Sequence, residues 1–191
     1  MDVPTMQAKQ SRLLVIDTVI TSSAGGNSST EGENTTVSRA VICREFLNAV
    51  FTLCHRMVMT DDLWDEWKAH RSSFSEQWYF RMKRKNKVKR VEVEPDKKLL
   101  EKLKRFISTE TAYEAVEKDF LLIQAAQASD RIIFSLDEAT RKPLSEAATH
   151  IGEIRLIYWL NPEHTDDDCI AWLENSCPPE KRRGLGYKSD E

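Results

Sequence analysis

Two acidic residues close short apolar runs of the chain, and they are the first candidates for chemistry. Residues 12–17 read RLLVID and end at Asp17, and residues 130–137 read DRIIFSLD and end at Asp137. Continuous runs of β-branched and aromatic residues are typical of strands buried in a parallel sheet. Because ligands bind outside the carboxyl ends of such strands, we predict that both carboxylates lie at the same edge of a sheet.

Two further acids are expected near this edge. Asp119 precedes the apolar positions of the helix that leads into the second of these strands. Glu66 belongs to a predicted helix that directly follows a brief strand candidate at residues 57–60. Asp62 and Asp65 are alternatives to Glu66, because they lie in the same predicted helix. The sequence therefore predicts a cluster of four carboxylates, with the second position open between three residues.

Carboxylates that converge repel one another and are costly to remove from water. A hard divalent cation resolves this conflict, and oxygen-only ligands suit Mg²⁺ or Mn²⁺. Such a site would activate a water and stabilise the leaving oxygen of a phosphodiester. Simpler interpretations remain open: Asp17 as a surface acid, Glu66 as a solvated helix residue, Asp137 as a helix N-cap, and Asp119 as a partner of Lys118.

The ordered set of motifs resembles the PIN-domain family, of which the VapC-like toxins are members. VIDT at residues 15–18 is followed by a helix-borne glutamate and then by KDxxxIxAAxASDxIIxSLD at residues 118–137. The resemblance covers roughly residues 13–160. It implies a metal-dependent ribonuclease in which Mg²⁺ or Mn²⁺ is held by the four acids, with two supporting hydroxyls nearby. The acids are Asp17, Glu66, Asp119 and Asp137, and the hydroxyls are those of Thr18 and Ser135.

The same resemblance implies an RNA substrate and a toxin or defence role. A toxin would be accompanied by an inhibitory protein partner, and many family members form homodimers. Two alternatives stay open at this point. The first is a structure-specific DNA nuclease, since 5′-nucleases share this kind of fold and acid cluster, and the second is a PIN-like scaffold that binds RNA or protein without cutting. Loss of the acid set would identify a scaffold, and all four positions are acidic here.

A basic run at residues 81–90, RMKRKNKVKR, is the second candidate for function. Lysine and arginine supply most contacts to nucleic-acid phosphates, so this run is a candidate RNA- or single-stranded-DNA-binding surface. A solvated helix face is the alternative interpretation. The candidate binding residues are Arg81, Lys83, Arg84, Lys85, Lys87, Lys89 and Arg90.

Strands that alternate with helices predict an α/β fold, a three-layer α/β/α sandwich with a central, mostly parallel sheet. We expect residues 1–160 to form the PIN-like domain, with a mobile Gly/Ser-rich loop at 21–37 and a basic helical insert at 74–106. Residues 161–191 would form a C-terminal helical extension with a flexible tail. Further expectations are helices at 38–56, from 61, at 111–129 and after Pro143, and a last strand at 153–162.

Composition limits the class of protein. A net charge of −3, with 40% hydrophobic residues and no apolar run near the roughly 18 residues that a membrane span needs, indicates a cytoplasmic protein without a membrane partner. The four cysteines form no C-x-x-C pair, so reduced thiols are expected. Helical spacing makes Trp64, Trp67 and Trp78 more typical of a core than of a base-stacking platform.

Overall fold

The central element is a parallel sheet of five strands. The computed structural model describes residues 10–26 and 38–187, and its strand order is β3-β2-β1-β4-β5. All four pairings are parallel, so every strand ends at the same edge of the sheet. The strands are β1 (Leu13–Ile16), β2 (Arg56–Met59), β3 (Val88–Arg90), β4 (Ile132–Phe134) and β5 (Tyr158–Leu160).

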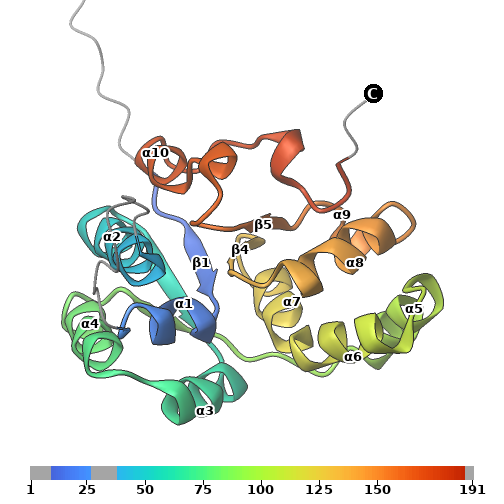
Figure 1. Cartoon of the computed structure of the whole chain (residues 1–191), viewed down its shortest axis with the longest axis horizontal. Coiled ribbons are helices and arrows are strands. Elements are labelled where there is room, and N and C mark those ends of the chain that lie inside the picture. Colours follow the sequence, from blue (N-terminus) through green and yellow to red (C-terminus); the bar gives the residue numbers. More distant parts are fainter. Residues whose placement is uncertain (1–9, 27–37, 188–191) are drawn as a thin grey trace, which may run out of the picture.

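Helices pack on both faces of this sheet, which confirms the predicted three-layer α/β/α sandwich. Figure 1 shows α2 and α7 on opposite sides of β1. The first helices are α1 (Thr18–Ser23), α2 (Arg39–Thr52), α3 (Asp61–His70), α4 (Ser73–Arg84) and α5 (Lys97–Phe106). The later ones are α6 (Glu110–Lys118), α7 (Phe120–Gln127), α8 (Glu138–Ala148), α9 (Gly152–Arg155) and α10 (Cys169–Glu174), with 3₁₀ turns at Thr165–Asp167 and Lys181–Arg183.

The sheet order creates a topological switch point between β1 and β4. From β1 the chain adds β2 and then β3 on one side, and it crosses afterwards to add β4 and β5 on the other. Connections therefore leave the adjacent carboxyl ends of β1 and β4 in opposite directions. Ligands of open α/β sheets bind in the crevice that this divergence creates. The two acids predicted from the strand ends, Asp17 and Asp137, follow these two strands.

The predicted helical insert at 74–106 is wrong in its middle part. Residues 88–90 form β3, which pairs with β2 from Met57 to Met59. This strand was missed because it carries two exposed cations and one half-buried valine, a pattern unlike that of a buried parallel strand. Charged residues are tolerated there because β3 is an edge strand.

Several predicted boundaries also differ from the structure. The first residues of the predicted loop belong to α1, and residues 27–37 of that loop lie outside the described residues. Helix α8 begins at Glu138 and contains Pro143, rather than beginning after it. The expected strand at 153–162 is instead the short helix α9 followed by β5, which begins only at Tyr158; the exposed Leu156 between them breaks the apolar run that suggested one strand.

The core accounts for most of the apolar pattern. Trp67 and Trp78 are buried, as the core interpretation of the tryptophans predicts. The side chains of Cys43, Cys169 and Cys177 are buried, and they form no disulfide in the described part of the chain. In the described part of the chain, no helix combines the length and the apolarity that a membrane crossing requires.

The segment expected as a flexible tail packs on the sheet through residue 187. Leu185 is buried, its backbone N–H donates to the Ile157 carbonyl at 2.9 Å, and Gly184 forms an antiparallel bridge with Tyr158. The Arg183 guanidinium lies over the ring of Trp172, 5.1 Å from its centre. Residues 188–191 of the predicted tail lie outside the described residues.

Trp172→Ala tests whether this extension belongs to the same cooperative unit. The indole is buried and donates to the Pro178 carbonyl at 3.0 Å, so its loss should lower the free energy of unfolding by about 3 to 5 kcal/mol. Tyr187→Ala, at a half-exposed ring, is the control and should change it by less than about 0.5 kcal/mol. Urea denaturation measures both, and an unchanged midpoint for Trp172→Ala would show that the extension unfolds separately.

Candidate active site at the carboxyl edge of the sheet

Asp17 is the most buried acid of the site, with 7% of its surface exposed. Its backbone N–H continues the ladder from β1 by donating to the Phe134 carbonyl at 3.0 Å. Its carboxylate accepts from the Val19 N–H at 3.1 Å, which caps α1, and from the Ser135 hydroxyl at 2.5 Å. Burial raises the pKa of the Asp17 carboxyl, and the Ser135 hydrogen bond opposes this rise. These two donors hold the Asp17 carboxylate in place, and because both are uncharged, neither neutralises it.

Asp137 lies beside Asp17 because β4 lies beside β1. The Ser135 hydroxyl that donates to Asp17 also accepts from the Asp137 N–H at 3.0 Å, so one side chain holds both segments. The Asp137 carboxylate caps α8 by accepting from the Thr140 N–H at 3.0 Å. The N-cap interpretation of Asp137 is thus correct, and its second carboxylate oxygen lies 3.1 Å from the Thr140 hydroxyl.

Asp119 lies at a break between two helices, where one continuous helix was expected. It ends α6 and precedes α7 with φ −95° and ψ 11°, and its side chain caps neither helix. The Thr140 hydroxyl lies 3.1 Å from carboxylate oxygens of both Asp119 and Asp137. Burial, the charge of Asp17 and the nearby Asp137 raise the pKa of Asp119 to about 6, against the opposing effect of Thr140.

Glu66 reaches the same place from α3. The Thr18 hydroxyl donates to the Glu66 carboxylate at 2.9 Å and lies 3.4 Å from Asp17. The two alternatives point elsewhere: Asp65 forms an ion pair with Lys68 at 2.7 Å, and Asp62 is exposed beside a separate cavity. Of the three acids open for the second position, Glu66 is the one that joins the cluster.

A single open cavity of about 420 Å³ brings the four acids together. Larger cavities of about 470, 500 and 620 Å³ lie beside the end of β3, at the α2–α10 side and beside β5, and none of these is lined by more than three acids. Within residues 10–26 and 38–187, no group of three or more His, Cys, Asp or Glu side chains is already arranged as a metal site. The donor set nevertheless fits a hard divalent cation, because its charged donors are all carboxylate oxygens.

Thr140 is a site residue that the sequence analysis missed. Its hydroxyl is buried and bridges two acids, which supports their positions as the predicted hydroxyls of Thr18 and Ser135 support theirs. The available signal was its spacing, three residues after the N-cap Asp137, which places it in the first turn of a helix directly above the cap. That signal was hidden because α8 was expected to begin later.

The basic run mostly lies away from this cavity. Arg81 packs over the Phe51 ring at 4.0 Å, and Lys87 donates to the carbonyls of Phe51 and Leu53, which precede β2 and lie at the amino edge of the sheet. Only the end of the run approaches the carboxyl edge, where Arg90 forms an ion pair with Asp61 at 3.1 Å. None of the seven basic residues predicted to contact nucleic acid lines the carboxylate cavity.

The raised pKa of Asp119 predicts a pH dependence of stability in the absence of divalent cations. The folded protein binds this proton more tightly than the unfolded chain, so stability falls as the pH rises from about 4 to about 6. Asp119→Asn removes the charge, and it should raise the free energy of unfolding at pH 7.5 by about 1 kcal/mol, a value reduced for the partial exposure of the group.

At pH 4 the Asp119→Asn variant should match the wild type, because the wild-type carboxyl is then protonated in the fold. Asp65→Asn, an exposed acid on α3, is the control and should show little change at either pH. Urea denaturation with a chelator present measures all three proteins. If Asp119→Asn is no more stable than the wild type at pH 7.5, then burial and the neighbouring carboxylates do not destabilise the ionised Asp119 side chain.

Comparison with known protein families found no family model that matches the chain, and comparison with curated proteins found no significant match. The geometry of the four carboxylates therefore carries the functional argument.

Proposed function

We propose that this protein is a divalent-metal-dependent nuclease that hydrolyses RNA phosphodiesters. One observation carries the proposal: four acids from four separate segments line one cavity at the switch point of a parallel sheet. Such an arrangement costs stability unless a cation or a proton offsets it. The resemblance to PIN domains supports RNA as the substrate, and single-stranded DNA is the alternative that the experiment below distinguishes.

Asp17, Glu66, Asp119 and Asp137 would hold Mg²⁺ or Mn²⁺, and the bound ion would stabilise charge on the phosphate and acidify an attacking water. The protein's own part is to keep these ligands in place. Ser135 orients Asp17 and ties it to the backbone of Asp137. Outer hydrogen bonds of this kind fix the direction of ligand oxygens and contribute to metal affinity.

Thr18 and Thr140 do the same for the other two acids. Thr18 connects Glu66 to the segment that follows β1, and Thr140 connects Asp119 to the first turn of α8. Helices α3 and α6 thereby become attached to the two central strand ends. A scaffold protein that only binds RNA would have no need for this set of mutually repelling groups, so the set favours catalysis over the scaffold alternative.

Cleavage of labelled single-stranded RNA and DNA in Mn²⁺ or Mg²⁺ tests the proposal. Asp17→Asn and Asp137→Asn keep the side-chain shape and remove ligand charge, so each should lower the rate of RNA cleavage by about 100-fold or more. Asp65→Asn, on the same helix as Glu66 but outside the cavity, should retain the wild-type rate within about twofold. Cleavage of DNA alone would favour the DNA-nuclease alternative, and metal-independent cleavage would contradict the proposal.

Metal binding without turnover provides a second test. A ligand that binds only the folded state at 100 times its Kd adds about 2.7 kcal/mol of stability, so Mn²⁺ should raise the melting temperature by several degrees. Asp17→Asn should abolish most of this rise, and Asp65→Asn should keep it. Equal rises in all three proteins would place the ion elsewhere.

A further inference from the structure

Two cationic side chains line the carboxylate cavity, and neither belongs to the basic run. Arg39 is the first residue of α2, and Lys118 is the last residue of α6. We propose, on the basis of the function proposed above, that Arg39 and Lys118 bind the phosphates of the nucleic-acid strand. In the absence of the strand, Glu163 pairs with Arg39, and a phosphate then takes the place of the Glu163 carboxylate. The basic run at 81–90 is then not the main binding surface of the site.

Electrostatics requires cations at this position. Four ionised carboxylates against Arg39 and Lys118 leave the cavity two charges negative, and one divalent cation would bring it to neutrality. A nucleic-acid backbone is itself anionic, so it approaches such a site only where positive side chains border it. Within residues 10–26 and 38–187, the Lys118 ammonium forms no ion pair, so it is available to an anion.

Arg39 already holds an anionic group in the geometry that a phosphate would take. Its Nε lies 2.7 Å from Glu163 Oε1, and its Nη2 lies 2.9 Å from Oε2. The guanidinium fork binds carboxylate and phosphate in the same bidentate manner. The Arg39 side chain is 59% exposed, so an incoming strand can reach it. The Glu163 side chain is 23% exposed, so water still reaches both partners, and an ion pair of this kind contributes only modest stability that a phosphate on Arg39 would replace.

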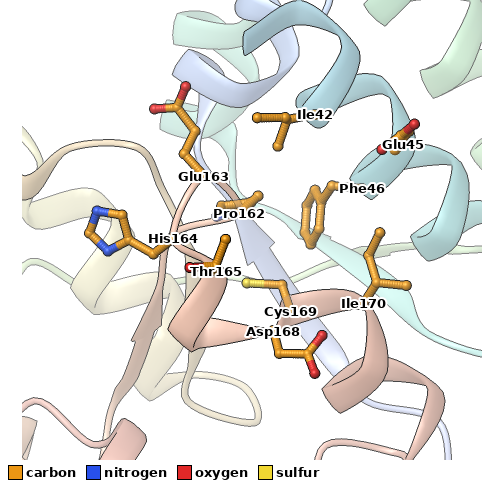
Figure 2. Close-up of a pocket in the computed structure, with 10 residues that line it drawn as sticks. All are labelled: Ile42, Glu45, Phe46, Pro162, Glu163, His164, Thr165, Asp168, Cys169 and Ile170. Carbon is orange, nitrogen blue, oxygen red and sulfur yellow. The ribbon is translucent and has the colours of Figure 1, made fainter. Parts of the chain in front are cut away.

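The cavity on the other side of Glu163 suits a strand poorly. It is bordered by three acids, Glu45, Glu163 and Asp168, and otherwise mainly by apolar side chains. Figure 2 shows the Glu163 carboxylate extending away from Phe46 and Cys169. Repulsion from these acids would keep a strand on the Arg39 side, so Glu163 marks one border of the strand's path.

Equilibrium binding of a fluorescent single-stranded RNA tests the inference, with every variant made in the Asp17→Asn protein so that the strand stays uncut. Arg39→Ala and Lys118→Ala are compared with Arg84→Ala and Lys83→Ala, which remove charges, also from exposed residues, at the end of α4. Arg39→Ala should raise the Kd about tenfold, and Lys118→Ala about threefold or more. Each should lower the slope of log affinity against log salt by about 0.7. The two α4 variants should stay within about twofold.

Glu163→Gln separates competition from a structural role. If Glu163 competes with phosphate for Arg39, its loss should lower the Kd about two- to fivefold. The double variant Arg39→Ala/Glu163→Gln should then bind as weakly as Arg39→Ala alone, because the two residues act through one interaction. If the role of Glu163 is purely structural, the Glu163→Gln substitution should instead weaken RNA binding.

The outcomes distinguish this inference from the nuclease proposal. Weaker RNA binding in the Arg39 and Lys118 variants supports the role of these two residues, whether or not the wild type cuts RNA. A wild-type protein that binds RNA but does not cut it would reject only the nuclease proposal. Weaker binding in the α4 variants, with Arg39→Ala and Lys118→Ala unchanged, overturns this inference and returns the binding surface to the basic run. Failure of the Asp17→Asn protein to bind RNA at all also overturns it.

Discussion

The hydrogen bond between Ser135 and Asp17 is the interaction on which the site depends. It joins the residue that follows β1 to the segment that follows β4, at the one place in the sheet where the chain leaves neighbouring strands in opposite directions. An ionised carboxylate with 7% exposure is costly, and the Ser135 hydroxyl and the Val19 N–H offset only part of that cost. A bound cation would offset the rest of this unfavourable electrostatic energy.

The other acids are arranged around this centre by hydroxyl groups. Thr18 brings Glu66 in from α3, and Thr140 holds Asp119 next to Asp137. Each hydroxyl fixes a carboxylate without neutralising it, so the cluster is positioned and still highly charged. The same density of negative charge would repel a nucleic-acid strand. Arg39 and Lys118, which border the cavity, would offset this repulsion. In the proposed function, binding of metal and binding of substrate would thus both follow from the same cluster of carboxylates.

The parts of this arrangement that depend on local pattern could be predicted from the sequence. Short apolar runs identified β1 and β4, and the parallel-sheet rule then predicted that Asp17 and Asp137 would lie together. The resemblance favoured Glu66 over Asp62 and Asp65, but the spacing of these acids could not decide between them, because the choice depends on the direction in which α3 packs.

Features set by tertiary contacts were missed for a related reason. The helix break at Asp119 carries no proline or glycine signal, and β3 has too few apolar residues to be recognised as a strand. Arg39 is an isolated cation in the sequence and becomes a neighbour of the acids only when α2 packs beside the same strand ends. Lys118 directly precedes Asp119, and the sequence indicated it only as a partner of that acid. The basic run at 81–90 predicted a binding surface because its charges are close together in the sequence. In the structure these charges lie on α4 and β3, which carry them from one edge of the sheet to the other.

Anomalous X-ray diffraction from crystals grown with Mn²⁺ would show whether these four carboxylates form a site for a divalent cation. We expect an anomalous peak inside the cavity, between the carboxylates of Asp17 and Asp137, with Glu66 and Asp119 turned toward it. An ordered cavity with no peak at saturating Mn²⁺, or a peak only at a site away from Asp17, would contradict it.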